Sequence, residues 1–98
     1  MVVGILQVRL AIPGAASLKD KRRVVRSVKD RLHRQHQVSV AEVDRQDDCE
    51  AAVLGIALAA SDVRVAQSVL DRIVDGLKNE RDCVLDDHQC EVMTGTPE

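Results

Sequence analysis

Polar and apolar residues alternate along the start of the chain, and this alternation predicts a β-strand over residues 2–12. Leu6 and Leu10 fall on one face of the segment, whereas Gln7 and Arg9 fall on the other. Successive side chains of a strand point to opposite faces, so a period of two is typical of a strand with one buried face. A proline and a glycine follow and end the pattern, because proline cannot donate a backbone hydrogen bond to a neighbouring strand.

Three further segments are predicted as strands, over residues 38–44, 50–60 and 83–93. In the middle segment Leu54, Ile56 and Leu58 recur at every other position, which favours a strand although the segment is rich in alanine. In the segment before it the alternation breaks near Ala41, where we expect a β-bulge. The last segment is polar and is expected at an edge of the sheet.

Two other segments carry the spacing of amphipathic helices. Ser17 followed by Asp20 is typical of a capping box at a helix start, and this helix is expected to reach about Gln35. Its apolar residues recur at intervals of three and four: Val24, Val25, Val28 and Leu32. A second helix is expected from Asp62 to about Asn79, again with apolar residues at helical spacing: Ala66, Val69, Leu70, Ile73 and Leu77.

The predicted order of elements is therefore βαββαβ. Each strand–helix–strand unit crosses over with a right hand, and both helices then cover the same face of the sheet. The order predicts an α+β fold, the ferredoxin-like plait, with a four-stranded antiparallel sheet and two helices on one face. We expect one domain over residues 1–93 and a disordered tail over residues 94–98. Because this fold hosts many unrelated functions, it indicates none by itself.

Composition adds one exclusion. The 98 residues include no Phe, Tyr or Trp, so the core has to be built from aliphatic side chains. Proteins that recognise single-stranded RNA on a sheet stack the bases on aromatic side chains. The chain has no such platform, so any contact with RNA is expected to use backbone charge or shape.

The net charge of −2 conceals a strongly basic segment. Residues 17–36 hold eight Lys or Arg and two Asp. The rest of the chain holds six Lys or Arg and fourteen Asp or Glu. Cations that share one helical face predict a surface for nucleic acid or another polyanion, and a merely solvated face is the alternative. The helix start is expected to add free N–H groups for an anion. The candidate binding residues are Lys19, Lys21, Arg22, Arg23, Arg26 and Lys29.

The sheet face that the helices leave open is expected to be small and partly apolar. A face of this kind commonly packs against a partner, so we predict a homo-oligomer, with a monomer as the alternative. The candidate interface residues are Ile5, Gln7, Val53 and Ala57.

The remaining groups with chemical potential give weaker indications. Cys49, Cys83 and Cys90 are odd in number and show no zinc-binding spacing with His88, so we expect reduced thiols, a cytoplasmic location and no metal. Two histidines at the end of the first helix, His33 and His36, are expected to stabilise the helix dipole. No apolar run is long enough to cross a membrane.

An acidic cluster lies between the second and third predicted strands: Asp44, Asp47, Asp48 and Glu50. We expect a solvated hairpin there, and Mg²⁺ binding or pairing with the basic helix of a neighbouring molecule are the alternatives. No phosphate-binding loop or nucleophile motif is present, so we expect no enzyme and no cofactor. Phosphate-ester or acyl-phosphate chemistry at the loop of residues 13–17 is the enzymatic alternative.

Two stretches carry a resemblance to a known family. One runs Ile12-Pro13-Gly14 and then Ser17-Leu18-Lys19-Asp20-Lys21-Arg22-Arg23-Val24-Val25; the other runs Val38-Ser39-Val40-Ala41-Glu42-Val43-Asp44 with Gln46-Asp47 and Leu54-Gly55. In order and spacing they resemble the YlxP-like family, small bacterial proteins of unknown function. The resemblance implies a ferredoxin-like plait and, since the genes of the family often lie beside genes for translation and ribosome maturation, work related to RNA. It implies no catalytic or binding residues.

The chain departs from that family near residues 48–51, where members often carry a hydrophobic–aromatic pair followed by a basic residue. Here Asp48, Cys49 and Ala51 stand instead. Taken together, the sequence predicts a non-enzymatic cytoplasmic module that presents a basic helix to RNA or a ribosomal particle, in translation or ribosome maturation. The alternative is an assembly module that uses its sheet face and acidic hairpin and has no role with nucleic acid.

Overall fold

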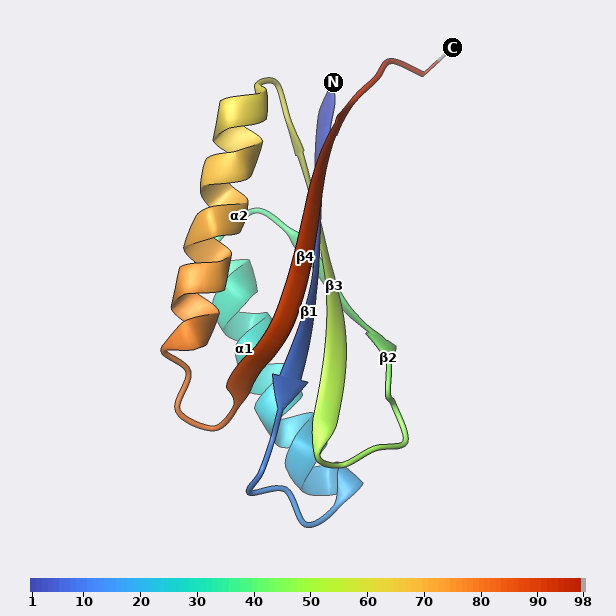
Figure 1. The fold of residues 1–98 in the computed structure, drawn as a ribbon, viewed down its shortest axis with the longest axis vertical. Helices are drawn as coiled ribbons and strands as arrows, with labels where there is room; N and C mark the ends of the chain where they lie inside the picture. Colours follow the sequence, from blue (N-terminus) through green and yellow to red (C-terminus); the bar gives the residue numbers. More distant parts are fainter. Residues whose placement is uncertain (98) are drawn as a thin grey trace.

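The computed structural model describes residues 1–97 and forms a single four-stranded antiparallel sheet with two helices (Figure 1). The strands lie in the order β2-β3-β1-β4 across the sheet. The elements follow one another along the chain as β1 (Val2–Ala11), α1 (Leu18–Gln35), β2 (Ser39–Asp44), β3 (Ala51–Ala60), α2 (Val63–Lys78) and β4 (Val84–Thr94). The predicted βαββαβ order and the ferredoxin-like plait are confirmed.

The core lies between the sheet and the two helices. Leu6 and Leu10 of β1 are fully buried, and Leu6 faces Ile56 of β3 across the ladder. Leu32 of α1 and Leu70 of α2 pack into this same cluster, so both helices cover one face of the sheet (Figure 1). The alternation in the sequence therefore separates a buried face from an open one, as the period of two predicts. Neither helix is long and apolar enough to cross a membrane.

The bulge predicted in β2 lies two residues beyond the expected place. The register between β2 and β3 shifts between Glu42 and Asp44, so Val43 is the extra residue rather than Ala41. The side chain of Val43 lies over Gly55, where an added Cβ would stand 2.9 Å from Val43 Cγ1. The missing side chain at Gly55 therefore makes room for the bulged residue on the open face of the sheet.

The two ends of the chain lie side by side, and this corrects the expected tail at Thr94 and Gly95. Thr94 belongs to β4, and the backbone of Gly95 exchanges two hydrogen bonds with Met1, at 2.9 and 3.0 Å. Because β4 runs antiparallel to β1, the pairing extends to the first residue of the chain and orders residues expected to fray. Residue 98, the last of the predicted tail, lies outside the described residues.

Close packing of α2 on β1 generates the first testable prediction. A Cβ at Gly4 would lie 3.2 Å from Leu70 Cδ1 and 3.3 Å from Leu58 Cγ. Gly4→Ala should therefore lower the free energy of unfolding by about 1–3 kcal/mol, measured by urea denaturation. The matched control is Gly76→Ala in α2, where an added Cβ would meet nothing within 4 Å. There the helix propensity of alanine should raise stability by up to about 1 kcal/mol. Stabilisation at both positions would contradict the packing described.

Candidate functional site

The outer surface of α1 carries six basic side chains, which we call the basic face: Lys19, Arg22, Arg23, Arg26, Lys29 and Arg34. Five of them are exposed, and Lys29 is half-buried. The opposite side of the helix holds the buried residues Val25, Val28 and Leu32, which pack on the sheet. The apolar stripe therefore determines which way the cations point, and it presents them together to solvent.

The basic face is short of compensating acids. Within residues 1–97, Arg23 is the one member that has a carboxylate in ion-pair range, with its NH2 nitrogen 3.7 Å from an oxygen of Asp20. Asp30 is also exposed on α1 but forms no ion pair with the described part of the chain. Several cations without partners on one helix produce a local positive potential, although the net charge of the protein is negative.

Lys21 was expected among the surface cations, and the structure shows that this expectation is wrong. Its side chain is 1% exposed. The Nζ atom donates hydrogen bonds to the backbone carbonyls of Arg45, at 2.5 Å, and Asp48, at 2.7 Å. Oε2 of Glu42 lies 2.7 Å from the same nitrogen, and this contact is an ion pair without hydrogen-bond alignment. The lysine therefore joins α1 to β2 and to the turn between β2 and β3.

Helical periodicity explains the position of Lys21 and would have predicted it. The residue precedes Val25 by four positions and Val28 by seven, so it lies on the buried stripe of the helix. Glu42 occupies the inward face of β2, opposite buried Leu54 of β3. A charge-based reading of the sequence grouped Lys21 with its neighbours along the chain, whereas its face on the helix separates it from them.

The start of α1 is capped by side chains of the protein itself. The Ser17 hydroxyl accepts a hydrogen bond from the backbone N–H of Asp20, at 3.2 Å, and the Asp20 carboxylate accepts one from the N–H of Ala16, at 3.1 Å. The Ser17 half of the predicted capping box is thus present, whereas Asp20 binds the N–H of Ala16 rather than that of Ser17 and places a negative charge at the positive end of the helix. An anion at this end of the helix would have to approach that carboxylate, and the anion site expected there stays a prediction.

The open face of the sheet differs from expectation at one residue. Ile5 is 39% exposed, and Gln7 and Ala57 are also exposed, as the predicted interface requires. Val53 is 7% exposed and lines a hollow together with Arg9 and Arg45. Val53 is therefore buried within the protein and is wrongly placed among the accessible interface residues.

Two exposed apolar residues on the open face were missed by the sequence analysis. Met93 lies opposite Val3 in the β1–β4 ladder and is 41% exposed. Val43 reaches this face through the bulge and is 49% exposed. The sequence carried no signal for Met93, because the register between β1 and β4 depends on a shift between Arg9 and Leu10 that no pattern indicates.

The arginines of the open face lie beside carboxylates, unlike most cations of the basic face. Arg9 Nε lies 3.5 Å from the Asp86 carboxylate, and Arg45 NH1 lies 3.5 Å from that of Asp48. Asp44 accepts a hydrogen bond from the N–H of Arg45 at 2.8 Å. Arg45 itself adopts a φ of 61°, in the left-handed region, at the start of the β2–β3 turn. The acidic hairpin thus uses its carboxylates to shape the turn and to pair with nearby arginines.

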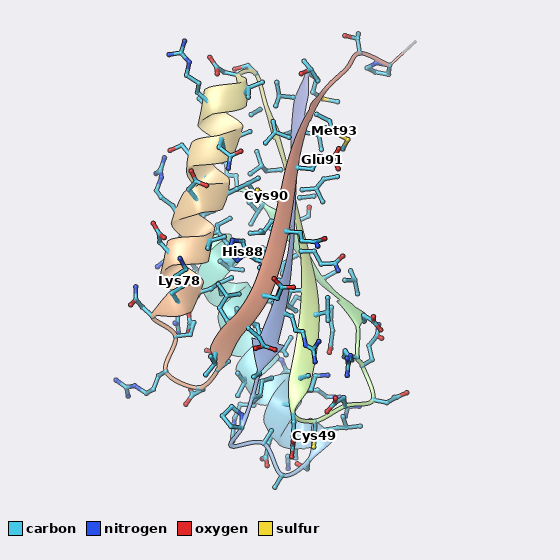
Figure 2. All side chains as sticks on the ribbon, viewed as in Figure 1. Cys49, Lys78, His88, Cys90, Glu91 and Met93 are labelled. Carbon is cyan, nitrogen blue, oxygen red and sulfur yellow. The ribbon has the colours of Figure 1, made fainter. Side chains whose placement is uncertain are left out.

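The three cysteines occupy different environments, and all are free thiols. Burial, followed by the nearby carboxylates of Glu80 and Asp82, raises the pKa of the Cys83 thiol to about 11, so it carries no thiolate near neutral pH. Cys90 and His88 lie beside α2, whereas Met93 lies on the other side of β4 (Figure 2). No three metal-ligating side chains gather among the residues that the structure describes.

Of the two histidines expected to favour the helix dipole, His36 differs from that expectation. Partial burial, followed by the nearby charge of Arg72, lowers the pKa of His36 from its usual 6.5. Its backbone N–H donates to the carbonyl of Leu32 and closes the helix. The environment therefore favours neutral imidazole over the cation that a helix C-terminus would attract.

Comparison with known protein families places the chain. Residues 3–90 match the family model described as a protein of unknown function, DUF503. The chain belongs to the DUF503 family. This family is one of small domains whose function is unknown. No match to a curated protein was found.

Two solved structures with similar folds are designed proteins. The designed protein Foldit4 superposes with a TM-score of 0.52 and 14% sequence identity, over 96% of this chain and 99% of that one. The designed protein LFR1 1 with ferredoxin fold superposes with a TM-score of 0.51 and 19% identity, over 99% of this chain and 89% of that one. At this identity the likeness shows the ferredoxin-like fold alone.

The burial of Lys21 yields a stability prediction. Lys21→Met would leave the Glu42 carboxylate without its cation and two carbonyls without their donor, so we expect a loss of about 2–4 kcal/mol in the free energy of unfolding. The matched control is Arg22→Met, because Arg22 is the next residue in the sequence and is exposed. Its expected change in the free energy of unfolding is within about 0.5 kcal/mol. Urea denaturation measures both. Equal effects of the two substitutions would show that Lys21 does not hold the turn.

The lowered pKa of His36 predicts a dependence of stability on pH. The unfolded chain takes up this proton more readily than the folded one, so the stability that neutral His36 contributes is present above about pH 6.5 and is lost as the pH falls. As the pH falls, the unfolding free energy of the wild type should therefore decrease relative to that of His36→Gln. A difference that stays constant with pH, or moves the other way, would contradict the environment described.

Proposed function

We propose that this protein is a non-enzymatic module whose basic face binds the phosphate backbone of RNA, free or within a ribonucleoprotein. The observation that carries the proposal is the set of cations on α1 that have no carboxylate in ion-pair range among residues 1–97: Lys19, Arg22, Arg26, Lys29 and Arg34. Lysine and arginine contacts to phosphates release condensed counterions, which favours binding whatever the base sequence.

Rigidity of the site supports the proposal. α1 has a capped start, a buried apolar stripe and the Lys21 contacts to the β2–β3 turn, so the backbone that carries the cations is fixed. Cations held on an ordered helix need little further ordering of the main chain when they meet a polyanion. By contrast, the paired arginines of the open face, Arg9 and Arg45, would have to give up carboxylate partners first.

The resemblance to the YlxP-like family supports a more specific setting. We propose that the chain is a bacterial, cytoplasmic member of that group and acts on RNA in translation or ribosome maturation. The three free thiols fit a reducing compartment. Base recognition plays little part in this proposal, because the sequence offers no aromatic side chain for stacking.

A second candidate function is assembly through the open sheet face. Ile5 and Met93 are exposed there at 39% and 41%, and they lie on neighbouring strands. Exposed apolar residues that share one face favour contact with a second copy of the chain. Such assembly is compatible with RNA binding, because the helices lie on the other side of the sheet. As a sole function, it would leave the basic face as a solvated surface.

The test of RNA binding is fluorescence anisotropy with a labelled RNA hairpin across a series of salt concentrations. If about five cations contact phosphates, the logarithm of the binding constant should fall with the logarithm of salt with a slope of about −4. The triple variant Arg22→Glu, Arg23→Glu and Arg26→Glu should lose at least about a hundredfold in affinity at low salt, because three contacts become repulsive.

The control places the same charge change on the other helix, with Arg64→Glu, Arg72→Glu and Lys78→Glu, all at exposed positions of α2. It should bind within a few fold of the wild type, and circular dichroism should show that both variants are folded. Absence of binding by the folded wild type at low salt contradicts the proposal and favours the assembly function. Equal losses in the two variants contradict the assignment to α1.

A further inference from the structure

We infer that the basic face of α1 binds double-helical RNA across the minor groove, with the two flanks of the helix contacting opposite phosphate backbones. This inference rests on the proposed function and names its substrate class. It follows from the distribution of cations around α1, from the shape of the surface that the helix forms, and from the absence of aromatic side chains in the sequence.

Four cations of the basic face, of which Lys29 is half-buried and the others are exposed, form two rows along the helix. Arg22 and Lys29 are seven residues apart and therefore lie within about 20° of one another around the axis. Arg23 and Arg34 are eleven residues apart, about three turns, and form a second row about 120° away. A single phosphate backbone would meet one row at a time. Two backbones on either side of a groove would meet both rows at once.

The centre of the basic face fits the same arrangement. Lys19 and Arg26 lie between the two rows and are both exposed, and the one acid there, Asp30, lies beside Arg26 and Arg34. From Lys19 to Arg34 the helix rises about 22 Å, so the contact has the length of several base pairs. The buried stripe and the contacts of Lys21 hold this line of charges in place. A rigid array of cations suits a rigid array of phosphates.

A flexible single strand suits this surface less well. Ordering a single strand costs conformational entropy. Proteins that bind single-stranded nucleic acid offset this cost by stacking bases on aromatic rings. The chain has none. A duplex has already ordered its phosphates through its own base pairing, so the cations alone can supply its binding free energy.

The shape of the surface selects the groove. An α-helix is about 10–12 Å across with its side chains, and α1 buries one side against the sheet along its length, so it protrudes by roughly half of that diameter. Such a low ridge fits a wide, shallow groove better than a deep and narrow one. The minor groove of A-form RNA is wide and shallow and can accept it, whereas the A-form major groove is deep and narrow.

The test compares the affinities of three labelled probes of equal length at one salt concentration. They are a blunt RNA duplex of about 16 base pairs, one of its strands alone, and the DNA duplex of the same sequence. The wild type should bind the RNA duplex at least about tenfold more tightly than either alternative. Two double variants separate the rows: Arg22→Gln with Lys29→Gln, and Arg23→Gln with Arg34→Gln. Each should reduce the salt slope for the RNA duplex by about 2, because each removes two phosphate contacts. Arg64→Gln with Arg72→Gln on α2 serves as the charge control and should leave the slope unchanged.

The outcomes separate this inference from the proposed function. Binding of the single strand or the DNA duplex as tightly as the RNA duplex overturns the inference and leaves RNA binding by α1 intact. Loss of affinity in one double variant with no change in the other also overturns it, because a single backbone is then contacted. No binding of any probe by the folded protein overturns the proposed function and the inference together.

Discussion

The buried ammonium of Lys21 is the contact on which the arrangement of the functional surface depends. Removing a charged amine from water costs several kcal/mol, and the protein offsets that cost with the Glu42 carboxylate and two backbone carbonyls of the β2–β3 turn. Those three oxygens come from segments more than twenty residues away in the sequence. The contact therefore fixes the first turns of α1 against the edge of the sheet, and with them the direction of the exposed cations.

From this follows a separation of charge across the molecule. The helix layer carries cations that lack acidic partners among the described residues, while the open face of the sheet pairs its arginines with aspartates. One basic residue in the interior, six on the basic face and Arg31, which pairs with Glu80, come from the same short segment of sequence. The unpaired charges are available to a polyanion, and the paired or buried ones stabilise the fold.

Much of the fold was predictable because periodicity, capping residues and turn residues all agree. Leu6, Leu10 and the Leu54–Leu58 alternation identify the buried face of the sheet without knowledge of contacts. Positions that depend on the register between strands were harder to predict from the sequence. The bulge at Val43 and the exposure of Met93 follow from register shifts between strands, and local sequence does not specify them. Lys21 is the instructive case, because its helical face predicts burial although its charge suggests exposure.

The central claim is that α1, and not the sheet, forms the surface for RNA. Mapping of backbone amide chemical shifts by NMR, during titration of the isotope-labelled protein with an RNA duplex, tests this claim most directly. The account predicts that the largest salt-sensitive shifts fall on the amides and side chains of α1 between Lys19 and Arg34, with the open-face residues Ile5, Gln7 and Met93 unchanged. The largest shifts on β1, β3 and β4, with α1 unaffected, would contradict it.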